Sequence, residues 1–365
     1  MTAPRVQLDC LTGVRGIAAW FVVFYHIRTG LADTLGPVTT AFLAKGYLAV
    51  DLFFMLSGFV IWLNYAASFE VRGMAAYHDF LKRRLARIYP LHLFVLVATM
   101  LLAATMTLTG RADPVRYPWS ELPLHLALLQ NWGFTTELSW NHPAWSISTE
   151  FAAYLAFPLL VIGLRLGRWP VLALCSGIVA LCFGLHLVMA SWGAPTLGVD
   201  IPRFGLLRCL IEFACGAMLC RVWMMWRARG AVVAPLATVA AALAALGWAM
   251  GAIAETLAFP LLIASLLLAL ALGGERRWNP LCARPIVWLG EISYSTYLIH
   301  FGGWTLFKLA LVRDASHVPL WQAGLFLALI LGGSILGYRF VEQPGRKWVS
   351  ARKWAFAAKD SVRPA

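Results

Sequence analysis

The sequence has few charged residues. Only 13% of its 365 residues are Asp, Glu, Lys or Arg, whereas 61% are hydrophobic. Soluble domains usually carry about 25% charged residues, so this balance excludes an ordinary soluble domain and predicts an integral membrane protein. Apolar runs recur from residue 10 to residue 341 with short polar breaks. We therefore predict one membrane domain over residues 1–345, followed by a basic cytoplasmic tail over 346–365.

The signatures of several enzyme classes are also absent. There is no Walker loop and no G-x-G-x-x-G motif, so nothing predicts nucleotide hydrolysis. The eight histidines are scattered, without an H-E-x-x-H motif or a Cys/His cluster, and we predict no metal. The seven cysteines form no C-x-x-C pair and lie mostly inside apolar runs, so we interpret them as small buried side chains and expect no disulfide framework.

Ten apolar stretches are about as long as a membrane-spanning helix, which needs roughly 20 residues. The predicted fold class is therefore all-α, with about ten transmembrane helices in a lipid bilayer. An even number places both termini on the same side. The stretches cover about residues 10–28, 46–66, 87–109, 143–164, 170–190, 203–222, 231–249, 253–273, 286–311 and 320–341.

The distribution of Lys and Arg predicts which side that is, because cytoplasmic loops are enriched in these residues. If both termini are cytoplasmic, twenty of the 30 basic residues lie in inner segments and four lie within helices. Six lie outside: Arg28, Lys45, Arg111, Arg116, Arg203 and Arg313. We therefore predict cytoplasmic termini. The same asymmetry accounts for the net charge of +13 without a nucleic-acid partner.

Ionisable side chains occur inside the apolar stretches, where each costs about 2.5–3.5 kcal/mol on insertion scales. In "RGIAAWFVVFYHI", Arg15 and His26 are eleven residues apart. They therefore share a helix face and lie about 16 Å apart along the axis. Asp51 and Glu150 are expected at a depth similar to that of His26, where a carboxylate can orient an imidazole that acts as a general base. The structural alternative is a snorkelling arginine and an interfacial histidine.

A pair of arginines occurs in "KRRLARIYP", where Arg84 and Arg87 have i, i+3 spacing on one helix face. Guanidinium groups suit phosphates, although the enrichment of basic residues in cytoplasmic loops explains this cluster equally well. Trp145, in "NHPAWSISTEF", either anchors the helix at the membrane interface or stacks on a sugar.

Two further helices carry polar residues at helical spacing. Ser293, Tyr297 and His300 share a face in the ninth stretch, where His300 either contacts substrate or forms a hydrogen bond to another helix. Arg208 and Glu212 are one turn apart in the sixth, which predicts an internal ion pair.

Together these stretches resemble the acyltransferase 3 family of membrane acyltransferases. The resemblance covers nearly the whole chain. It rests on "LTGVRGIAAWFVVFYH", "GYLAVDLFFMLSGF", "FLKRRLARIYP", "PAWSISTEF", "ISYSTYLIH" and "FVEQP", which occur in this order. Members of this family move an acyl group, often acetyl, from cytoplasmic acyl-CoA to hydroxyls on extracytoplasmic glycans or other acceptors.

The resemblance implies a role for each motif. The family's Arg-x10-His motif falls on Arg15 and His26, and its Arg-x-x-Arg motif falls on Arg84 and Arg87. The arginines would bind the CoA phosphates, and His26 would be the essential catalytic histidine.

We combine the resemblance with the residue pattern in one hypothesis. The donor, acetyl-CoA in particular, binds Arg15, Arg84 and Arg87, and His26 acts with Asp51 or Glu150. Trp145, Tyr297 and His300 contact the acceptor, a surface glycan. The predicted location is the bacterial inner membrane. Direct transfer and an acyl-His intermediate both remain open.

The alternatives concern the acceptor and the class of protein. Acylation of a small secondary metabolite and a non-catalytic transporter of the same topology are both compatible with the sequence. Some members of the family carry a fused SGNH-type domain. This sequence has none, so any acceptor-handling domain would belong to a separate extracytoplasmic partner.

Overall fold

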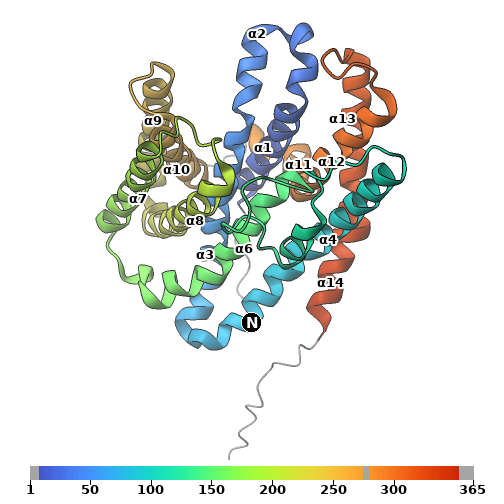
Figure 1. The fold of residues 1–365 in the computed structure, drawn as a ribbon. Helices are drawn as coiled ribbons and strands as arrows, with labels where there is room; N and C mark the ends of the chain where they lie inside the picture. The colour runs from blue at the N-terminus through green and yellow to red at the C-terminus, as the bar shows by residue number, and fades with distance from the viewer. Residues whose placement is uncertain (1–7, 274–278, 353–365) are drawn as a thin grey trace, which may run out of the picture.

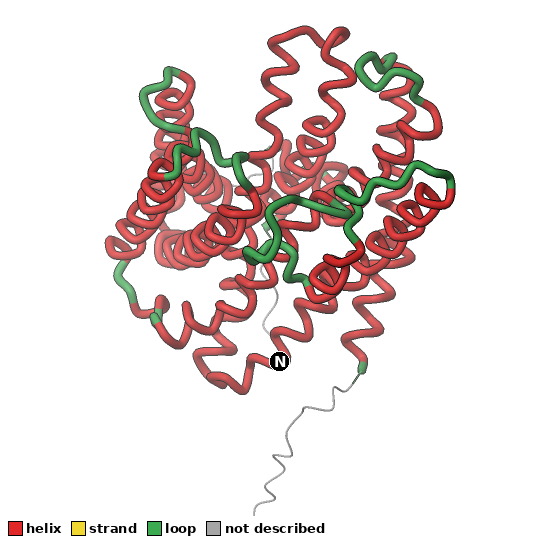
Figure 2. Tube along the Cα trace, viewed as in Figure 1, coloured by secondary structure: helices red, strands yellow, loops and turns green. Residues whose placement is uncertain are grey.

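The computed structural model describes residues 8–273 and 279–352, which form helices and no β-strand (Figures 1 and 2). The all-α prediction is confirmed for these residues. The α-helices are α1 (Asp9–Ile27), α2 (Ala32–Leu43), α3 (Ala49–Arg72), α4 (Tyr77–Leu108), α5 (Leu122–Ala127), α6 (Trp145–Pro158), α7 (Val171–Ser191), α8 (Ile201–Trp226), α9 (Gly230–Ala249), α10 (Glu255–Gly273), α11 (Arg284–Glu291), α12 (Ser293–Leu311), α13 (Leu320–Leu336) and α14 (Gln343–Ala351).

Six helical segments within the described ranges are long and apolar enough to cross a membrane. The first, the fourth and the sixth each contain more than one α-helix. The segments are Asp9–Leu108, His142–Gly163, Val171–Ser191, Ile201–Ala249, Glu255–Gly273 and Leu320–Ala351. These segments support an integral membrane protein.

Each of the ten predicted stretches overlaps a helix, but the ninth is interrupted. The stretch 286–311 consists of α11, which ends at Glu291, and α12, which begins at Ser293. The predicted end of the membrane domain after residue 345 falls inside α14. Of the predicted tail, residues 353–365 lie outside the described residues, as do the predicted cytoplasmic residues Arg5, Arg276 and Arg277.

Glycines allow α3 and α8 to pack closely along each other. A Cβ atom at Gly58 would lie 1.9 Å from the Phe213 carbonyl oxygen, and one at Gly216 would lie 1.8 Å from the Met55 carbonyl oxygen. Neither distance is compatible with a side chain. Gly58 and Gly216 therefore permit the close approach between the two helices.

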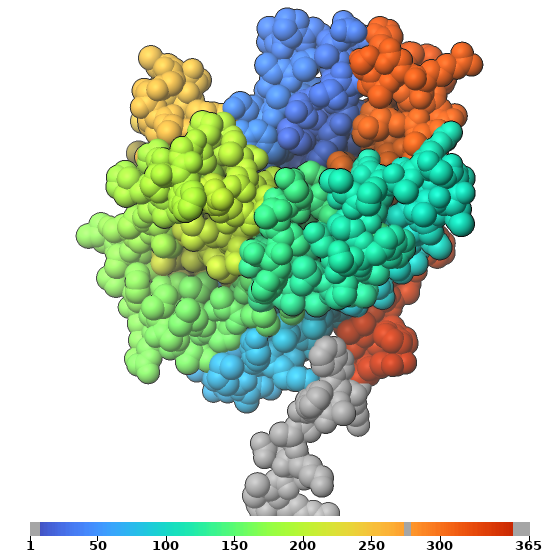
Figure 3. All heavy atoms as spheres, viewed as in Figure 1, coloured from blue at the N-terminus to red at the C-terminus, as the bar shows by residue number. Residues whose placement is uncertain are grey.

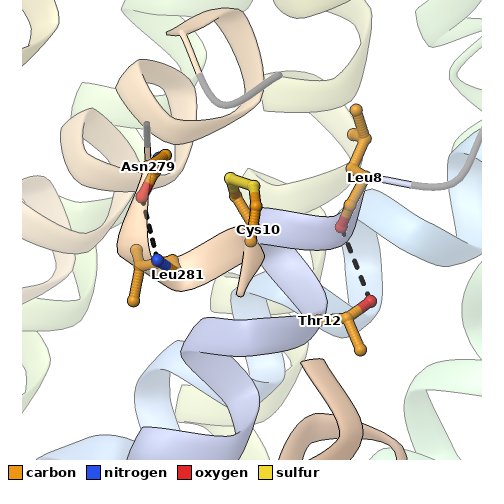
Figure 4. The surroundings of a disulfide bond; sticks show 6 residues. Leu8, Cys10, Thr12, Asn279 and Leu281 are labelled. Atoms are coloured by element: carbon orange, nitrogen blue, oxygen red, sulfur yellow. Dashed lines mark hydrogen bonds between the residues drawn. A yellow bond between two sulfur atoms is a disulfide. The ribbon is translucent and has the colours of Figure 1, made fainter. Parts of the chain in front are cut away.

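A second close contact joins α1 to α11. A Cβ atom at Gly290 would lie 1.8 Å from the Thr12 carbonyl oxygen, and one at Gly16 would lie 2.7 Å from the Gly290 nitrogen. The same contact brings together Cys10 and Cys282, which form a disulfide (Figure 4). Our expectation for these two cysteines was wrong. They lie 272 residues apart, and only the packing of α1 against the segment before α11 brings them together.

The segment between α4 and α6 runs across one face of the bundle (Figures 2 and 3). The His92 ring donates to the carbonyl oxygen of His125 (2.9 Å), and the Ser139 hydroxyl donates to Glu121 (2.6 Å). Because that hydroxyl donates to a carboxylate, the His125 ring nitrogen 2.9 Å away acts as a donor to it. Burial lowers the pKa of His125 to about 3, so the ring stays neutral and fastens the segment.

We expect Gly58→Ala to destabilise the protein. Ala favours a helix over Gly by up to about 1 kcal/mol, so helix propensity alone would stabilise the variant. A loss of stability would therefore come from the clash of the new Cβ with the Phe213 carbonyl oxygen. Overpacking usually costs about 1–3 kcal/mol. The measurement is the thermal midpoint of the purified protein in detergent. The matched control is Gly184→Ala on α7, where an added Cβ meets no atom within 4 Å. Equal midpoints for the two variants would contradict the assignment.

Candidate active site

The interruption between α11 and α12 positions Arg15. Its guanidinium donates to the Ser293 hydroxyl (3.1 Å), which in turn donates to the Gly290 carbonyl (2.7 Å). Ser293 is the first residue of α12, so the end of one helix and the start of the next form the partner for a buried arginine. Irregular backbone at membrane depth is tolerated where it lines a cavity, and Arg15 and Ser293 line one.

All three predicted donor-binding arginines line this cavity, which we call the arginine cavity. The Arg84 guanidinium donates to the Tyr65 hydroxyl (2.9 Å) and has no ion-pair partner among the described residues. Arg87 forms an ion pair with Glu342, which also accepts a hydrogen bond from Ser295 (3.0 Å). The spacing of Arg84 and Arg87 therefore does place both at one site.

A further pocket adjoins the arginine cavity at Arg84, which lines both. Three other cationic side chains, from α4 and α14, line the pocket: Lys82, Arg83 and Arg346. These side chains come from near the start of α4 and from α14, and both of these parts of the chain lie at the lower end of the molecule in Figure 1. This end of the site is strongly cationic.

Glu150 lies in the arginine cavity rather than beside His26. Its carboxylate accepts hydrogen bonds from the Ser57 hydroxyl and the Tyr154 hydroxyl, the latter at 2.6 Å. Neither of these hydrogen bonds is the predicted contact of Glu150 with His26. The carboxylate of Glu150, on α6, points toward Ser57 of α3 instead. The residue pattern of the sequence does not predict this bond between Ser57 and Glu150.

His26 lines a second cavity, of about 50 Å³, which we call the histidine cavity. His142, Trp145, Arg208 and Tyr297 line it as well. Trp145 is only 5% exposed, and its ring centroid lies 5.7 Å from that of Phe54, so it is a buried wall of the cavity. The alternative of an interfacial anchor for Trp145 does not fit this burial.

The hydrogen bonds of His26 define its tautomer. Nδ1 lies 2.9 Å from the Val22 carbonyl oxygen, which can only accept, so Nδ1 carries the hydrogen. The same Nδ1 lies 3.1 Å from His300 Nε2. His300 Nδ1 lies 3.2 Å from the Thr296 carbonyl, so by the same reasoning His300 Nε2 is an acceptor. Val22 and His300 therefore share the Nδ1 hydrogen of His26. Its Nε2 has no hydrogen-bond partner in the described part of the chain, which leaves the lone pair of this nitrogen free.

Asp51 forms an ion pair with Arg208 (2.6 Å), and both side chains are almost completely buried. This arrangement differs from two expectations, the orientation of His26 by Asp51 and the ion pair of Arg208 with Glu212. The reason is that α3 and α8 pack along each other, which gives Arg208 a partner on the neighbouring helix. His300, predicted as a substrate contact, takes the position beside His26.

Tyr297 lines both cavities. Its hydroxyl lies 2.9 Å from the Ser146 hydroxyl and donates to the Pro143 carbonyl (3.2 Å). The predicted shared face of Ser293, Tyr297 and His300 is confirmed. Ser293 lines the arginine cavity, Tyr297 lies between the two cavities, and His300 contacts His26.

Sequence reasoning missed His142, whose ring centroid lies 6.4 Å from that of His26. The signal was its place directly before the "PAWSISTEF" motif, where a helix begins. In the described part of the chain, no group of three or more His, Cys, Asp or Glu side chains is arranged to hold a metal ion.

Comparisons with known proteins agree on a family. The profile of the acyltransferase domain family matches residues 8–339. The chain is 31% identical to the protein named Acyltransferase MdmB of Streptomyces mycarofaciens, over 98% of this chain and 96% of that protein. It is 22% identical to a protein of Staphylococcus aureus strain COL named "Putative O-acetyltransferase", over 94% of this chain but only 58% of that protein. No solved structure matches the chain.

The profile match covers nearly all of the described helices, from the start of α1 to the end of α13, and includes both cavities. The chain therefore belongs to the acyltransferase 3 family of membrane acyltransferases.

Proposed function

We propose that the protein is a membrane O-acyltransferase that moves an acyl group from acyl-CoA to a hydroxyl of an extracytoplasmic glycan. The observation that carries the proposal is the pair of cavities that share Tyr297 as a wall. One holds three arginines suited to phosphates, and the other holds a histidine with a free lone pair.

In this proposal CoA enters from the cytoplasm. The cationic pocket of Lys82, Arg83 and Arg346 receives phosphates, and Arg84 bridges it to the arginine cavity. The pantetheine arm then passes Glu150, whose carboxylate can accept from an amide N–H. Arg15 and His26 are about 16 Å apart along α1. The pantetheine arm spans this distance between the phosphates at Arg15 and the thioester at His26.

His26 acts as the general base. Its Nε2 takes the proton of the acceptor hydroxyl while the hydroxyl oxygen attacks the thioester carbonyl carbon. The new C–O bond replaces the C–S bond, and the proton passes from His26 to the departing thiolate, which gives free CoA. The small histidine cavity, about 50 Å³, supports a short acyl group such as acetyl.

The acceptor approaches from the other side of the membrane. This direction requires ten membrane crossings with both termini in the cytoplasm, as the twenty inner basic residues support. The enzyme would lie in a bacterial inner membrane, and Trp145 offers an aromatic surface to a sugar ring. Because the chain spans 58% of the staphylococcal relative, a separate extracytoplasmic partner would handle acceptors that need a further domain.

We expect Arg84→Gln to weaken donor binding by about 10- to 150-fold, because a hydrogen bond to a charged group contributes about 1.5–3 kcal/mol. The measurement is the Kd for acetyl-CoA by isothermal titration with the protein in lipid nanodiscs. The control is Arg229→Gln, which changes an exposed arginine outside both cavities. Equal Kd values for the two variants would remove Arg84 from the donor site.

Replacement of His26 by Ala should lower acyl transfer by about 100- to 10,000-fold, the usual contribution of a general base. The assay follows transfer of radiolabelled acetyl from acetyl-CoA to glycan extracts by protein in liposomes. The control is His317→Ala, whose side chain is 61% exposed. Turnover by His26→Ala close to that of the control would reject the general-base role. Absence of labelled product from the unsubstituted enzyme with every acceptor would reject the proposed function.

His300→Phe should lower kcat by about 3- to 10-fold without changing the KM for acetyl-CoA, because it removes one neutral hydrogen bond to His26. The kinetic constants are measured with the same transfer assay. A raised KM with an unchanged kcat would instead place His300 in substrate binding, as the sequence had suggested.

A further inference from the structure

Arg208 is buried in an arrangement that leaves one of its donor groups unused. The side chain is 1% exposed, and Nε and Nη2 both donate to Asp51 Oδ1, at 3.2 and 2.6 Å. The third guanidinium nitrogen, Nη1, is buried and has no hydrogen-bond partner among the described residues. A buried charged donor without a partner costs more than an ordinary unmade hydrogen bond.

The position of this unused donor suggests what it is for. Arg208 lines the histidine cavity together with His26. Its guanidinium carbon lies 5.6 Å from the ring centroid of Trp145, which forms another wall of the same cavity. Among the described residues that line the cavity, Arg208 is the one that carries a charge at every physiological pH.

Three other side chains that line the cavity already use their donor groups: Tyr47, Tyr297 and His26. The Tyr47 hydroxyl donates to Glu255 (2.5 Å), and the Tyr297 hydroxyl donates to the Pro143 carbonyl (3.2 Å). The Nδ1 hydrogen of His26 is shared between Val22 and His300. Arg208 therefore differs from these neighbours, because Asp51 holds the guanidinium in place while Nη1 remains uncommitted.

Acyl transfer creates a demand for such a donor. When the acceptor oxygen bonds to the thioester carbon, the carbonyl electron pair moves to the carbonyl oxygen, which becomes an oxyanion. Preorganised donors aimed at that oxygen usually supply the largest single catalytic effect. Stability does not account for the buried ion pair of Arg208 and Asp51, because apolar residues can often replace a buried ion pair without loss of stability.

We infer that Arg208 is a catalytic residue whose Nη1 binds the thioester carbonyl oxygen and stabilises the oxyanion during transfer. The inference rests on the proposed acyl transfer and adds a residue to it. Collapse of the tetrahedral intermediate re-forms the C=O bond and expels the CoA thiolate, so Arg208 neither gains nor loses a proton. Asp51 then acts as a positioning residue that fixes the guanidinium, rather than as a partner of His26.

The test replaces the pair by uncharged residues, because loss of Arg208 alone would leave a buried carboxylate unpaired. The double variant Arg208→Gln with Asp51→Asn should lower kcat by about 100- to 1,000-fold, the usual effect of removing one oxyanion donor. The KM and the Kd for acetyl-CoA should stay within about twofold. Arg208→Lys, which keeps a charged donor beside Asp51, should recover at least part of the lost kcat.

A second interhelical ion pair provides the matched control. Lys45 pairs with the buried Glu255 at 2.7 Å, and neither residue lines the two cavities. Gln at position 255 keeps an acceptor for the Tyr47 hydroxyl, which Glu255 binds at the edge of the histidine cavity. The double variant Lys45→Gln with Glu255→Gln should keep kcat near that of the unsubstituted enzyme. Thermal midpoints and gel filtration of all variants in detergent check that they are folded.

The outcomes separate the inference from the proposed function. A folded Arg208→Gln, Asp51→Asn variant that transfers acetyl near the unsubstituted rate overturns the role of Arg208 and leaves the proposed function intact. Joint loss of kcat, donor affinity and thermal stability also overturns it, because the pair would then be structural. An unsubstituted enzyme without transfer activity overturns the proposed function, and the role of Arg208 with it.

Discussion

The site depends on the pairing of α1 with α12 through two polar contacts. Arg15 binds Ser293 at one end, and His26 binds His300 at the other. Along the helix axis, Arg15 and His26 are about 16 Å apart on α1, whereas their partners Ser293 and His300 are about 10 Å apart on α12. The long arginine side chain accounts for the difference. Both contacts form in one register, so a slip of either helix would break the alignment of the two cavities.

Charge is distributed unequally among the three arginines of the first cavity. Among the described residues, Arg87 forms an ion pair with Glu342, whereas Arg84 donates to the Tyr65 hydroxyl and Arg15 to the Ser293 hydroxyl, and neither of these two forms an ion pair. An arginine with a neutral partner keeps its positive potential for an incoming anion, and one bound to a carboxylate largely loses it. Arg15 and Arg84 are therefore the stronger candidates for phosphate contacts, and Arg87 holds α4 against the end of the α13 segment.

The sequence predicts relations within a helix well, because helix geometry is fixed. The shared faces of Arg15 and His26, of Arg84 and Arg87, and of Ser293, Tyr297 and His300 all follow from 3.6 residues per turn. Partners on different helices do not follow from spacing. Depth alone placed Asp51 and Glu150 near His26, but rotation of α3 and α6 directs them to Arg208 and to Ser57. The break before Ser293 also has no proline signal at its position.

The disulfide between Cys10 and Cys282 raises the question of what holds α1 against α11 in the cell. In the proposed orientation this end of α1 faces the cytoplasm, where thiols are normally kept reduced. The close approach does not depend on the bond, since Gly16 and Gly290 let the two backbones meet within a distance that any side chain would prevent. Packing at these glycines therefore sets the position of Arg15 one residue away, and the cysteines lie side by side as a consequence.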